Sequence, residues 1–349
     1  MSFVPNACTI SWSSTVEVLR GEYVFAALYC RSRDSLVNNR WLAALNTTQG
    51  NPRPSLSLIT PTYNSEAYVV EALDSVDTEV LEHLVVDGGS SDRTVALAAN
   101  RPGVRIIPGP DRGIYDALNK GIAAATGEVV GFLNSDDRYP AGAIADVLDA
   151  FAADPSLAVL SGHAMVFNRV GAAEQIVARH CKRARNLLTP DNAMRSVPII
   201  NARFFRRTIF RAIGGFNLNY PLAADREFLI RVALSGEKSV FLERVLYEYR
   251  AHEGSKTLSG TVTTAAGLAA ENLTMVETLL PQWEAQPAIR ASALGWYRDY
   301  LVTALVAAVR AGSLRNLIAT LRRGTMTDPF WFVAMPWIVW RKLATRFQS

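Results

Sequence analysis

The apolar residues at 129–133 predict a buried strand. Two polar residues follow it, and two adjacent carboxylates, Asp136 and Asp137, come next. In open α/β sheets, ligands bind in the crevice outside the carboxyl ends of the strands. Hard divalent cations that bind together with phosphates need one or two carboxylates at such a point. The structural alternative is that Asp136 caps a helix beginning near Pro140. The position favours a metal or phosphate site without excluding that cap.

A third carboxylate, Asp225, precedes the helical apolar pattern formed by Phe228, Leu229 and Val232. A carboxylate within hydrogen-bond reach of a hydroxyl group can act as its general base. Asp is also preferred at helix N-termini, so a capping role is the alternative.

The stretch that must position these groups alternates apolar strands with helices. Strands are expected at residues 56–60, 83–87, 104–107 and 128–133. One helix is expected at about 65–76, a second follows the loop at 87–92 and ends at about residue 99, and a third is expected at 113–125. The alternation predicts a mainly parallel, doubly wound α/β sheet flanked by helices. The loops at residues 61–66, 87–92 and 134–137 then meet at one edge of the sheet. Backbone N–H groups, hydroxyls and carboxylates at such an edge suit a nucleotide.

Beyond Pro155 the pattern loosens into short strands and turns. A helix is expected at residues 221–234, strands near 239–242 and 245–249, and a mostly helical region from about 261 to 323. These changes divide the chain into an N-terminal extension of unknown role (1–53), a catalytic domain (54–256) and a helical C-terminal region (257–349).

Composition indicates a globular protein, since 49% of residues are hydrophobic and 19% are charged. The formal net charge of +4 is mild, and no nucleic-acid partner is expected. Cys8, Cys30 and Cys181 lack metal-ligand spacing and are typical of free thiols in a reducing compartment. No apolar run reaches the roughly 20 residues of a transmembrane helix, and the start lacks a secretory pattern. These features favour a cytoplasmic protein.

The segment from Pro329 to Trp340 is apolar on all sides and holds three of the seven tryptophans. Aromatic residues beside cations suit an anionic membrane interface. Basic residues flank the segment on both sides: Arg322, Arg323, Arg341, Lys342 and Arg346. A core helix or a dimer contact is the alternative. Pro336 predicts a kinked or broken helix.

The segment from Leu56 to about His252 resembles the family-2 glycosyltransferases, which have the GT-A fold. Five motifs in the right order carry the resemblance: Pro61-Thr62-Tyr63-Asn64; residues 85–92; residues 111–121; Asn134-Ser135-Asp136-Asp137; and Gly214-Gly215-Phe216 followed by Ala224-Asp225-Arg226-Glu227. The segment at 111–121 is similar to one common in bacterial capsule and exopolysaccharide members.

The resemblance implies a metal-dependent, hexosyltransferase-like, inverting enzyme that moves a sugar from a nucleotide-sugar donor to a saccharide acceptor in polysaccharide biosynthesis. It implies Asp225 as the catalytic base and Asp136 as the ligand of a divalent cation, Mg²⁺ or Mn²⁺. The expected nucleotide-sugar contacts are Pro61, Thr62, Tyr63, Asn64, Glu66, Asp87, Gly88, Asn119, Lys120, Asn134, Ser135 and His252.

The implied acceptor is a saccharide or lipid-linked oligosaccharide, handled on an anionic membrane surface at the cytoplasmic face of the inner membrane. An oligomer is possible. Two positions depart from the family pattern. Asn134 stands at the first position of the metal-binding DxD region, and Gly88 stands where many relatives have a second Asp. The second departure leaves a uridine preference open.

Two other functions compete with this interpretation. A sugar-nucleotide nucleotidyltransferase would need a Gly-rich, basic phosphate loop after the first strand, where this chain has Pro-Thr-Tyr-Asn-Ser-Glu. A catalytically inactive GT-A membrane scaffold would not need both Asp136 and Asp225.

Overall fold

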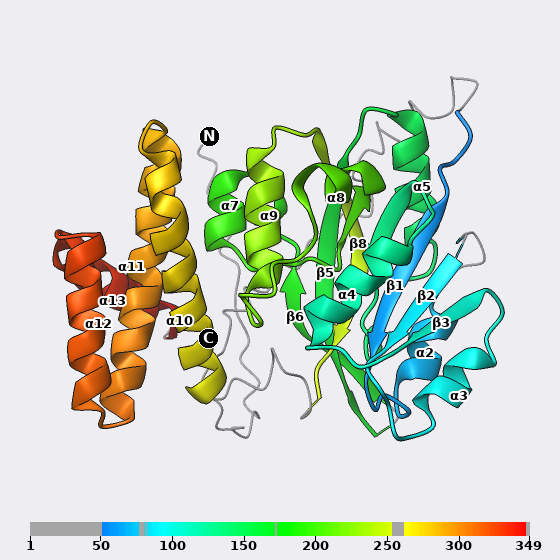
Figure 1. The fold of residues 1–349 in the computed structure, drawn as a ribbon, viewed down its shortest axis with the longest axis horizontal. Helices are drawn as coiled ribbons and strands as arrows, with labels where there is room; N and C mark the ends of the chain where they lie inside the picture. The colour runs from blue at the N-terminus through cyan, green and yellow to red at the C-terminus, as the bar shows by residue number, and fades with distance from the viewer. Residues whose placement is uncertain (1–50, 77–79, 81, 172, 253–261, 347–349) are drawn as a thin grey trace, which may run out of the picture.

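The computed structural model describes residues 51–76, 80, 82–171, 173–252 and 262–346. Within these residues the centre of the molecule is an eight-stranded mixed sheet with the order β3-β2-β1-β4-β7-β5-β6, and β8 pairs with β5. Figure 1 shows helices on both faces of this sheet, with the C-terminal helices at one end of the molecule and β1–β3 toward the other. The expected N-terminal extension and the cysteines Cys8 and Cys30 lie outside the described residues, apart from 51–53.

The first four strands are parallel, as the sequence predicts. They are β1 (Leu56–Thr62), β2 (Glu82–Asp87), β3 (Val104–Pro108) and β4 (Val129–Phe132). All seven residues of β1 are buried, because the strand lies inside the sheet and is covered on both faces. The register pairs Thr62 with Asp87 and Ile59 with Phe132, so the carboxyl ends of β1, β2 and β4 reach the same edge.

Alternate residues of β1 face two different cores. Ile59 packs in a core with Leu118 of α4 (Ile114–Ala124) and Phe228 of α9 (Ala224–Leu234). Leu58 packs in a second core with Val147 of α5 (Ala143–Ala153). The period of two along a strand produces this separation. Two short helices complete the second face: α2 (Val69–Asp74) and α3 (Thr94–Ala99).

The second half of the sheet is mixed and less regular than the first. β7 (Arg203–Arg206) is antiparallel to β4 and to β5 (Val159–Val170), and β6 (Ala173–His180) is antiparallel to β5. β8 (Ser239–Arg250) runs parallel to β5. The prediction of two strands at 239–242 and 245–249 is wrong, because β8 is one strand. Its register with β5 shifts between Phe241 and Val245, which interrupts the sequence pattern without ending the strand.

Helices form the rest of the chain. They are α6 (Arg183–Asn186), α7 (Pro190–Arg195), α8 (Arg207–Ile213), α10 (Val262–Leu279), η1 (Leu280–Trp283), α11 (Pro287–Arg310), α12 (Leu314–Thr327) and α13 (Trp331–Arg346). The core that contains Phe228 continues through Trp296 of α11. α13 runs through Pro336 as a single helix, so the expected break is absent there.

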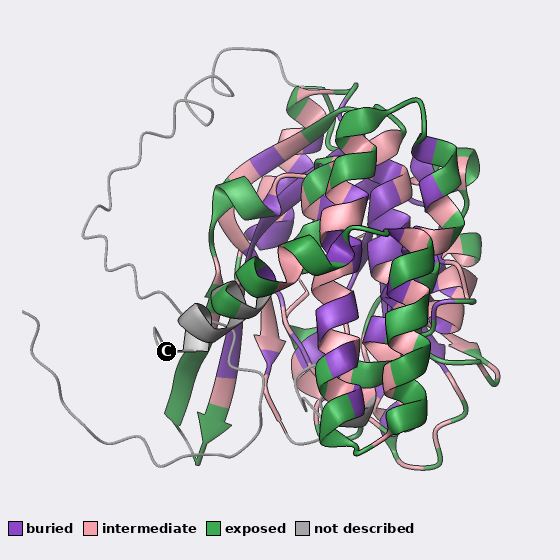
Figure 2. Ribbon diagram, turned by 90° about the vertical axis from the view of Figure 1, so that its left-hand side faces the viewer, coloured by how far each residue is buried: buried purple, intermediate pink, exposed green. Residues whose placement is uncertain are grey.

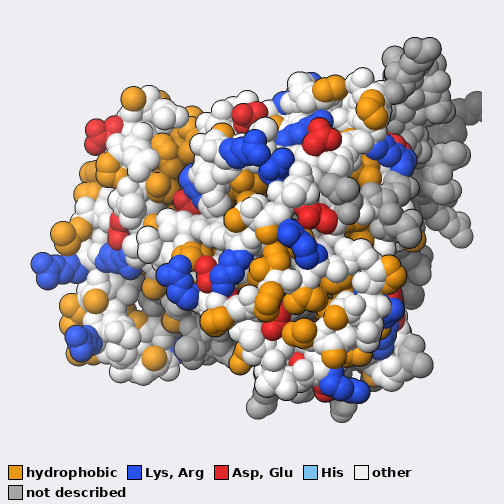
Figure 3. All heavy atoms as spheres, turned by 45° about the vertical axis from the view of Figure 1, so that its right-hand side comes forward, with side chains coloured by type: hydrophobic (Ala, Val, Ile, Leu, Met, Phe, Trp, Pro, Cys, Tyr) orange, Lys and Arg blue, Asp and Glu red, His pale blue; other side chains and the backbone are white. Residues whose placement is uncertain are grey.

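Many residues of the last two helices, α12 and α13, are exposed to solvent. Figure 2 looks onto the side of the molecule that carries α12 and α13, and much of both helices is exposed there. Among the described helices, none combines the length and the apolar character needed to cross a bilayer. On the face shown in Figure 3, cationic and anionic side chains are interspersed with apolar ones.

Candidate active site

The three loops predicted to meet at the sheet edge are connected by direct hydrogen bonds. The hydroxyls of Ser65 and Ser135 are 2.8 Å apart, which joins the first loop to the third. The Asn64 backbone N–H donates to the Ser90 hydroxyl at 2.9 Å, and the Ser91 N–H donates to Asn64 Oδ1 at 2.9 Å. Asn64 has a positive φ of 49°, an uncommon conformation for a residue other than glycine. The expected convergence of the loops is therefore confirmed.

Asp87 holds the second loop in shape. Its Oδ1 accepts from the hydroxyls of Thr62 and Ser90, at 3.1 and 2.5 Å, and its Oδ2 accepts from the N–H groups of Gly89 and Ser90, at 3.0 and 2.9 Å. The side chain is buried. These bonds engage both oxygens within the protein, so a contact of Asp87 with nucleotide remains a prediction.

Glu66 and Asp92 connect the first loop to the second by hydrogen bonds. The Glu66 N–H donates to Asp92 Oδ2, and the Arg93 N–H donates to Glu66 Oε2, both at 3.1 Å. Asp92 Oδ1 also accepts from the N–H of Thr94, the first residue of α3. The structure thus gives Glu66 a role in joining the two loops, and its expected contact with the nucleotide stays a prediction.

The carboxylate pair at the end of β4 divides into an inner and an outer member. Asp137 is buried, where its Oδ2 accepts from Tyr247 Oη and Asn134 Nδ2, both at 2.9 Å, and its Oδ1 accepts from the Arg250 N–H at 2.7 Å. Burial, together with the neighbouring charge of Asp136, raises the pKa of Asp137 to about 8. The inner carboxylate is therefore a structural group with its oxygens already bonded.

Asp136 is the outer member, and its side chain is 30% exposed. Its Oδ2 lies 2.8 Å from Nε2 of His252, and its carbonyl oxygen accepts from Nε of Arg250 at 2.9 Å. The helix-cap alternative for Asp136 is wrong, because α5 starts at Ala143 after Gly142. The structure brings the predicted residues Asp136 and His252 together.

The residues around Asp136 fit a cation that shares its ligands with a phosphate. The described residues contain no cluster of three or more His, Cys, Asp or Glu side chains that could hold a metal ion alone. Mg²⁺ is commonly bound through one or two carboxylates, with substrate phosphates and waters as the other ligands. A partly exposed carboxylate at the carboxyl edge of the sheet meets this requirement.

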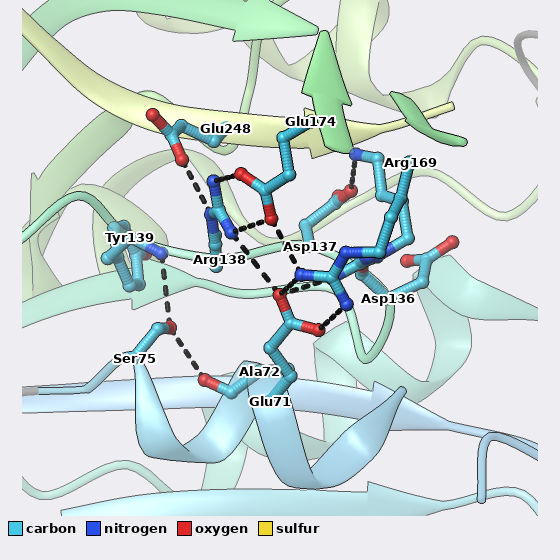
Figure 4. A network of polar contacts seen from close by, with 11 residues as sticks. Glu71, Ala72, Ser75, Asp136, Asp137, Arg138, Tyr139, Arg169, Glu174 and Glu248 are labelled. Atoms are coloured by element: carbon cyan, nitrogen blue, oxygen red, sulfur yellow. Dashed lines mark hydrogen bonds and ion pairs between the residues drawn. The ribbon is translucent and has the colours of Figure 1, made fainter. Parts of the chain in front are cut away.

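A network of three arginines and three glutamates lies beside the carboxylate pair, and Figure 4 labels two of the arginines and all three glutamates. Its members are Arg138, Arg169 and Arg250 with Glu71, Glu174 and Glu248. Arg138 donates from Nε to Glu248 at 2.6 Å and from Nη2 to Glu174 at 2.8 Å. Hydrogen bonds from Arg138 and Arg169 lower the pKa of Glu174 to about 2. The network ties the residue after Asp137 to α2, β6 and β8.

Asp225 lies in the first turn of α9, two residues after the N-cap position at Ala223. Its Oδ1 accepts from the Arg226 N–H at 2.7 Å. Burial raises the pKa of Asp225 to about 6. The loop before it is held by Glu271 of α10, whose Oε2 accepts from the N–H groups of Leu222 and Ala223 at 2.9 and 3.0 Å.

Asn119 and Lys120 bond to neighbouring segments of the protein. Asn119 Nδ2 donates to the carbonyl of Phe216, and the Phe216 N–H donates to Asn119 Oδ1, both at 2.8 Å. A Cβ at Gly215 would lie 2.3 Å from Asn119 Oδ1, so this contact needs glycine. Lys120 Nζ donates to the carbonyl of Pro110 at 2.6 Å. Their expected contacts with the nucleotide remain predictions.

Comparison with known proteins decides the family. The family model for glycosyl transferase family 2 matches residues 57–214. An uncharacterized glycosyltransferase of Mycobacterium tuberculosis is 33% identical over 203 residues, which are 56% of this chain and 75% of the relative. A PGL/p-HBAD biosynthesis glycosyltransferase of Mycobacterium bovis is 33% identical over 190 residues, which are 51% of this chain and 69% of the relative. The chain belongs to glycosyltransferase family 2.

A solved structure shows the same fold. It is the mannosyltransferase from Pyrobaculum calidifontis in complex with GDP-Man and Mn²⁺, with a TM-score of 0.52 and 21% sequence identity. The alignment covers 88% of this chain and 94% of the mannosyltransferase. The expected GT-A fold, with a largely parallel sheet core and a helical C-terminal region, is confirmed.

The structure shows what surrounds Gly88, one of the two departures of this family-2 member from the family pattern. A Cβ at Gly88 would lie 2.4 Å from Oδ2 of Asp111. The Asp111 carboxylate therefore occupies the space that a side chain at position 88 would need. Asp111 in turn accepts from the Gly113 N–H at 2.9 Å, at the start of α4.

Sequence reasoning missed the groups that support the site. The three glutamates of the network, Arg138 and Tyr247 come from segments far apart in the chain, and none carries a local signal except Arg138, which follows the carboxylate pair directly. Tyr249 was also missed. Burial raises its pKa, with further contributions from the charges of Asp137 and Asp225.

Proposed function

We propose that this family-2 glycosyltransferase is an inverting enzyme that moves a sugar from a nucleotide-sugar donor to a saccharide acceptor. One observation carries the proposal: the partly exposed carboxylate of Asp136 lies 2.8 Å from Nε2 of His252 at the carboxyl edge of the sheet, where hydrogen bonds join the three loops. We place the leaving diphosphate at this edge and the general base at Asp225, in the first turn of α9. Displacement of a nucleoside diphosphate in a single step requires groups that stabilise the leaving anion and a general base that accepts the proton of the attacking hydroxyl.

In the proposed reaction the acceptor hydroxyl oxygen attacks the anomeric carbon from the face opposite the diphosphate. The new C–O bond forms as the bond to the diphosphate oxygen breaks, so the anomeric configuration inverts. Asp225 takes the proton of the hydroxyl, and the nucleoside diphosphate leaves with the bonding electron pair. With a pKa of about 6, Asp225 is ionised at neutral pH and close to the pKa that general-base catalysis favours.

Asp136 is the proposed protein ligand of the divalent cation. A bound Mg²⁺ or Mn²⁺ would neutralise the negative charge that develops on the diphosphate. The other proposed nucleotide-sugar contacts follow the three loops: Pro61, Thr62, Tyr63, Asn64, Glu66, Asp87, Gly88, Asn134 and Ser135, with Asn119, Lys120 and His252 from neighbouring segments. Tyr63 is 66% exposed, which leaves its ring available to a ligand.

We assign the reaction to bacterial polysaccharide or glycolipid assembly, with a lipid-linked saccharide as acceptor and capsule or exopolysaccharide enzymes as the related branch. The names of two relatives support this assignment. One is the PGL/p-HBAD biosynthesis glycosyltransferase. The other is the O-antigen biosynthesis protein of Myxococcus xanthus, which is 30% identical over 62% of this chain and 17% of its own length.

A donor screen tests the proposal. The full chain is incubated with UDP-, GDP- and dTDP-sugars with Mn²⁺ or Mg²⁺, and nucleoside diphosphate release is followed with and without excess chelator. A glycosyltransferase releases the diphosphate from at least one donor in the presence of metal. Release of pyrophosphate from a nucleoside triphosphate and a sugar 1-phosphate would instead show a nucleotidyltransferase. Binding of nucleotide without turnover of any donor or acceptor would indicate an inactive scaffold.

We also propose that α12 and α13 bind an anionic membrane surface at the cytoplasmic face of the inner membrane. One side of α13 is anchored in the protein, since Trp331 and Ile338 are buried. Large apolar side chains on the other side of α13, on α12 and in the link between the two helices are exposed: Leu314, Ile318, Leu321, Met326, Phe330, Phe332, Val333, Trp337 and Trp340. Arg315 and Arg322 are exposed among them, whereas Asp328 is buried against Arg298. Described residues 300–346 expose apolar side chains and cations but no carboxylate. A surface of this kind matches an anionic lipid surface.

We propose residues 54–256 as the catalytic domain and residues 257–349 as the region that faces the membrane, and the described part of the latter, residues 262–346, is mostly helical.

A further inference from the structure

Glu271, on α10, bonds to the backbone just before the proposed base. Oε2 of Glu271 accepts from the N–H groups of Leu222 and Ala223, at 2.9 and 3.0 Å. The Ala223 N–H also reaches the carbonyl of Tyr220, at 3.2 Å. One carboxylate oxygen from a helix far along the chain therefore binds two consecutive peptide groups at the start of α9.

The start of α9 needs an acceptor from outside the helix. The first N–H groups of a helix lack intrahelical acceptors, and a polar side chain at the N-cap position commonly supplies one. The N-cap residue of α9 is Ala223, which makes no side-chain cap, and Asp225 follows two residues later in the first turn. A negative charge at this end of a helix is also favoured by the helix dipole. Glu271 supplies both the acceptor and the charge.

Gly267 lets α10 come close enough to make these bonds. Gly267 and Glu271 are four residues apart, so they lie on the same face of the helix. A Cβ at Gly267 would lie 3.0 Å from Cδ1 of Leu222, which is shorter than the usual contact between carbon atoms. The Leu222 side chain therefore lies against the helix while its N–H bonds to Glu271.

A shared core fixes α10 relative to α9. Leu273 of α10 and Phe228 of α9 are both buried in that core. Because protein cores are close-packed, the two helices cannot shift independently of each other. The Glu271 carboxylate is thus presented to the loop from a rigid support.

We infer that Glu271 is a positioning residue for the proposed base: its two hydrogen bonds fix the first turn of α9 where the Asp225 carboxylate can reach the acceptor hydroxyl. A displacement of about 1 Å at a reacting group can lower the rate by about 10²-fold. The inference rests on the proposed function of Asp225. Glu271 lies outside residues 57–214, which the family model matches, so this role belongs to the C-terminal helices of the chain.

The first test is Glu271→Ala in the full chain, which removes both hydrogen bonds. With a donor from the screen, kcat should fall by about 10–100-fold, because Asp225 loses its position. The donor KM and the affinity for the nucleoside diphosphate should stay close to the wild-type values. Without any substrate, hydrogen–deuterium exchange at Leu222 and Ala223, measured by mass spectrometry of the peptide 217–226, should become about tenfold faster.

Two conservative variants separate the hydrogen bonds from the charge. Glu271→Gln keeps an oxygen at the same reach, so it should recover most of the lost kcat. Glu271→Asp keeps the charge on a shorter side chain, so it should behave like Glu271→Ala. The opposite order would show that the charge and not the hydrogen bonds is needed, and would overturn the inference. The same comparison decides the question if Glu271→Ala does not fold.

Glu277→Ala is the matched control on the same helix. Oε1 of Glu277 accepts from Arg323 Nε at 2.6 Å and from Tyr297 Oη at 2.9 Å, so it bonds to α12 and α11 and not to the loop before α9. This variant should lose comparable stability and leave kcat and the exchange of the peptide 217–226 unchanged. A purely structural role of Glu271 predicts a wild-type kcat per folded molecule in Glu271→Ala, and that result overturns the inference.

Asp225→Asn distinguishes a failure of this inference from a failure of the proposed function. If Glu271 acts through Asp225, adding Glu271→Ala to Asp225→Asn should lower kcat little further. A full 10–100-fold fall in that background would show that Glu271 acts on another group, and would overturn the inference while Asp225 remains the base. If Asp225→Asn alone turns over at the wild-type rate, the proposed base is wrong, and the positioning role falls with it even where the exchange data confirm the two hydrogen bonds.

Discussion

At the scale of single residues, Asp225 carries the sharpest prediction. Asp225→Asn keeps the shape of the side chain but cannot accept a proton, so turnover should fall by about 10²–10⁴-fold. Affinity for the nucleoside diphosphate should stay close to the wild-type value. The measurement compares both quantities in one preparation, and wild-type turnover in the variant would place the base elsewhere.

The wild-type enzyme should show the pKa of Asp225 in its pH profile. The base must be deprotonated, and its pKa is raised to about 6, so kcat/KM should rise with pH up to about 6 and level off above it. An acidic limb centred near pH 4, the ordinary range of an aspartate, would contradict the effect of burial.

Asp136 should govern binding of the cation. Asp136→Ala removes the partly exposed carboxylate, so metal-dependent diphosphate binding should weaken and transfer should be lost, as with excess chelator. Asp154→Asn is the matched control, because Asp154 lies on the surface at Ser156 and Lys238 and away from the sheet edge. Full activity of Asp136→Ala in chelator would exclude the proposed metal role.

At the scale of elements, the network around Arg138 links β6 and β8 to the loop that carries Asp136. Arg138→Met leaves the carboxylates of Glu174 and Glu248 without their shared partner. We expect a loss of about 1–2 kcal/mol in the free energy of unfolding, since the group is partly exposed, and weaker binding of diphosphate. Arg53→Met is the control, because its more exposed pair with Asp149 should cost about 0.5 kcal/mol or less. An equal loss in the free energy of unfolding of both variants, measured by urea titration, would show that the network does not have this role.

The elements also show what sequence alone can predict. The strand at β4 and the carboxylates after it were predictable, because a fully buried parallel strand is an unbroken apolar run. The partners of Asp137 were not, since Tyr247 and Arg250 follow it by 110 and 113 residues. The prediction split β8 in two at its register shift with β5. Glu271 gave no sign of bonding to the loop before Asp225, because the two segments meet only in the folded chain.

At the scale of the whole molecule, the exposed face of α12 and α13 should bind membranes. Replacing Phe332, Trp337 and Trp340 by Ser should abolish sedimentation with phosphatidylglycerol vesicles and leave donor turnover unchanged. The fold should survive, since these side chains are 57%, 61% and 59% exposed. Each exposed cation should add about 1 kcal/mol to binding, so salt should weaken it.

Val170→Ser is the control for the membrane prediction. It removes a side chain that is 61% exposed on β5, away from the two helices, and should not alter vesicle binding. Vesicle binding by the triple variant at the wild-type level would contradict the proposal. A wild-type protein that ignores vesicles but sediments as a dimer, while the triple variant is a monomer, would assign the face to self-association.

The bonds from Glu271 to the N–H groups of Leu222 and Ala223 limit how this enzyme can be recombined. A chimera that takes residues 54–256 from this chain and its tail from another glycosyltransferase would keep Asp225 but lose the carboxylate that steadies the loop before it. Tail exchange intended to change the acceptor could then reduce turnover for a reason unrelated to acceptor recognition. A crossover placed after Leu279 would keep this brace, but the α11 that replaces the original must still fill the place of Trp296 in the core shared with Phe228.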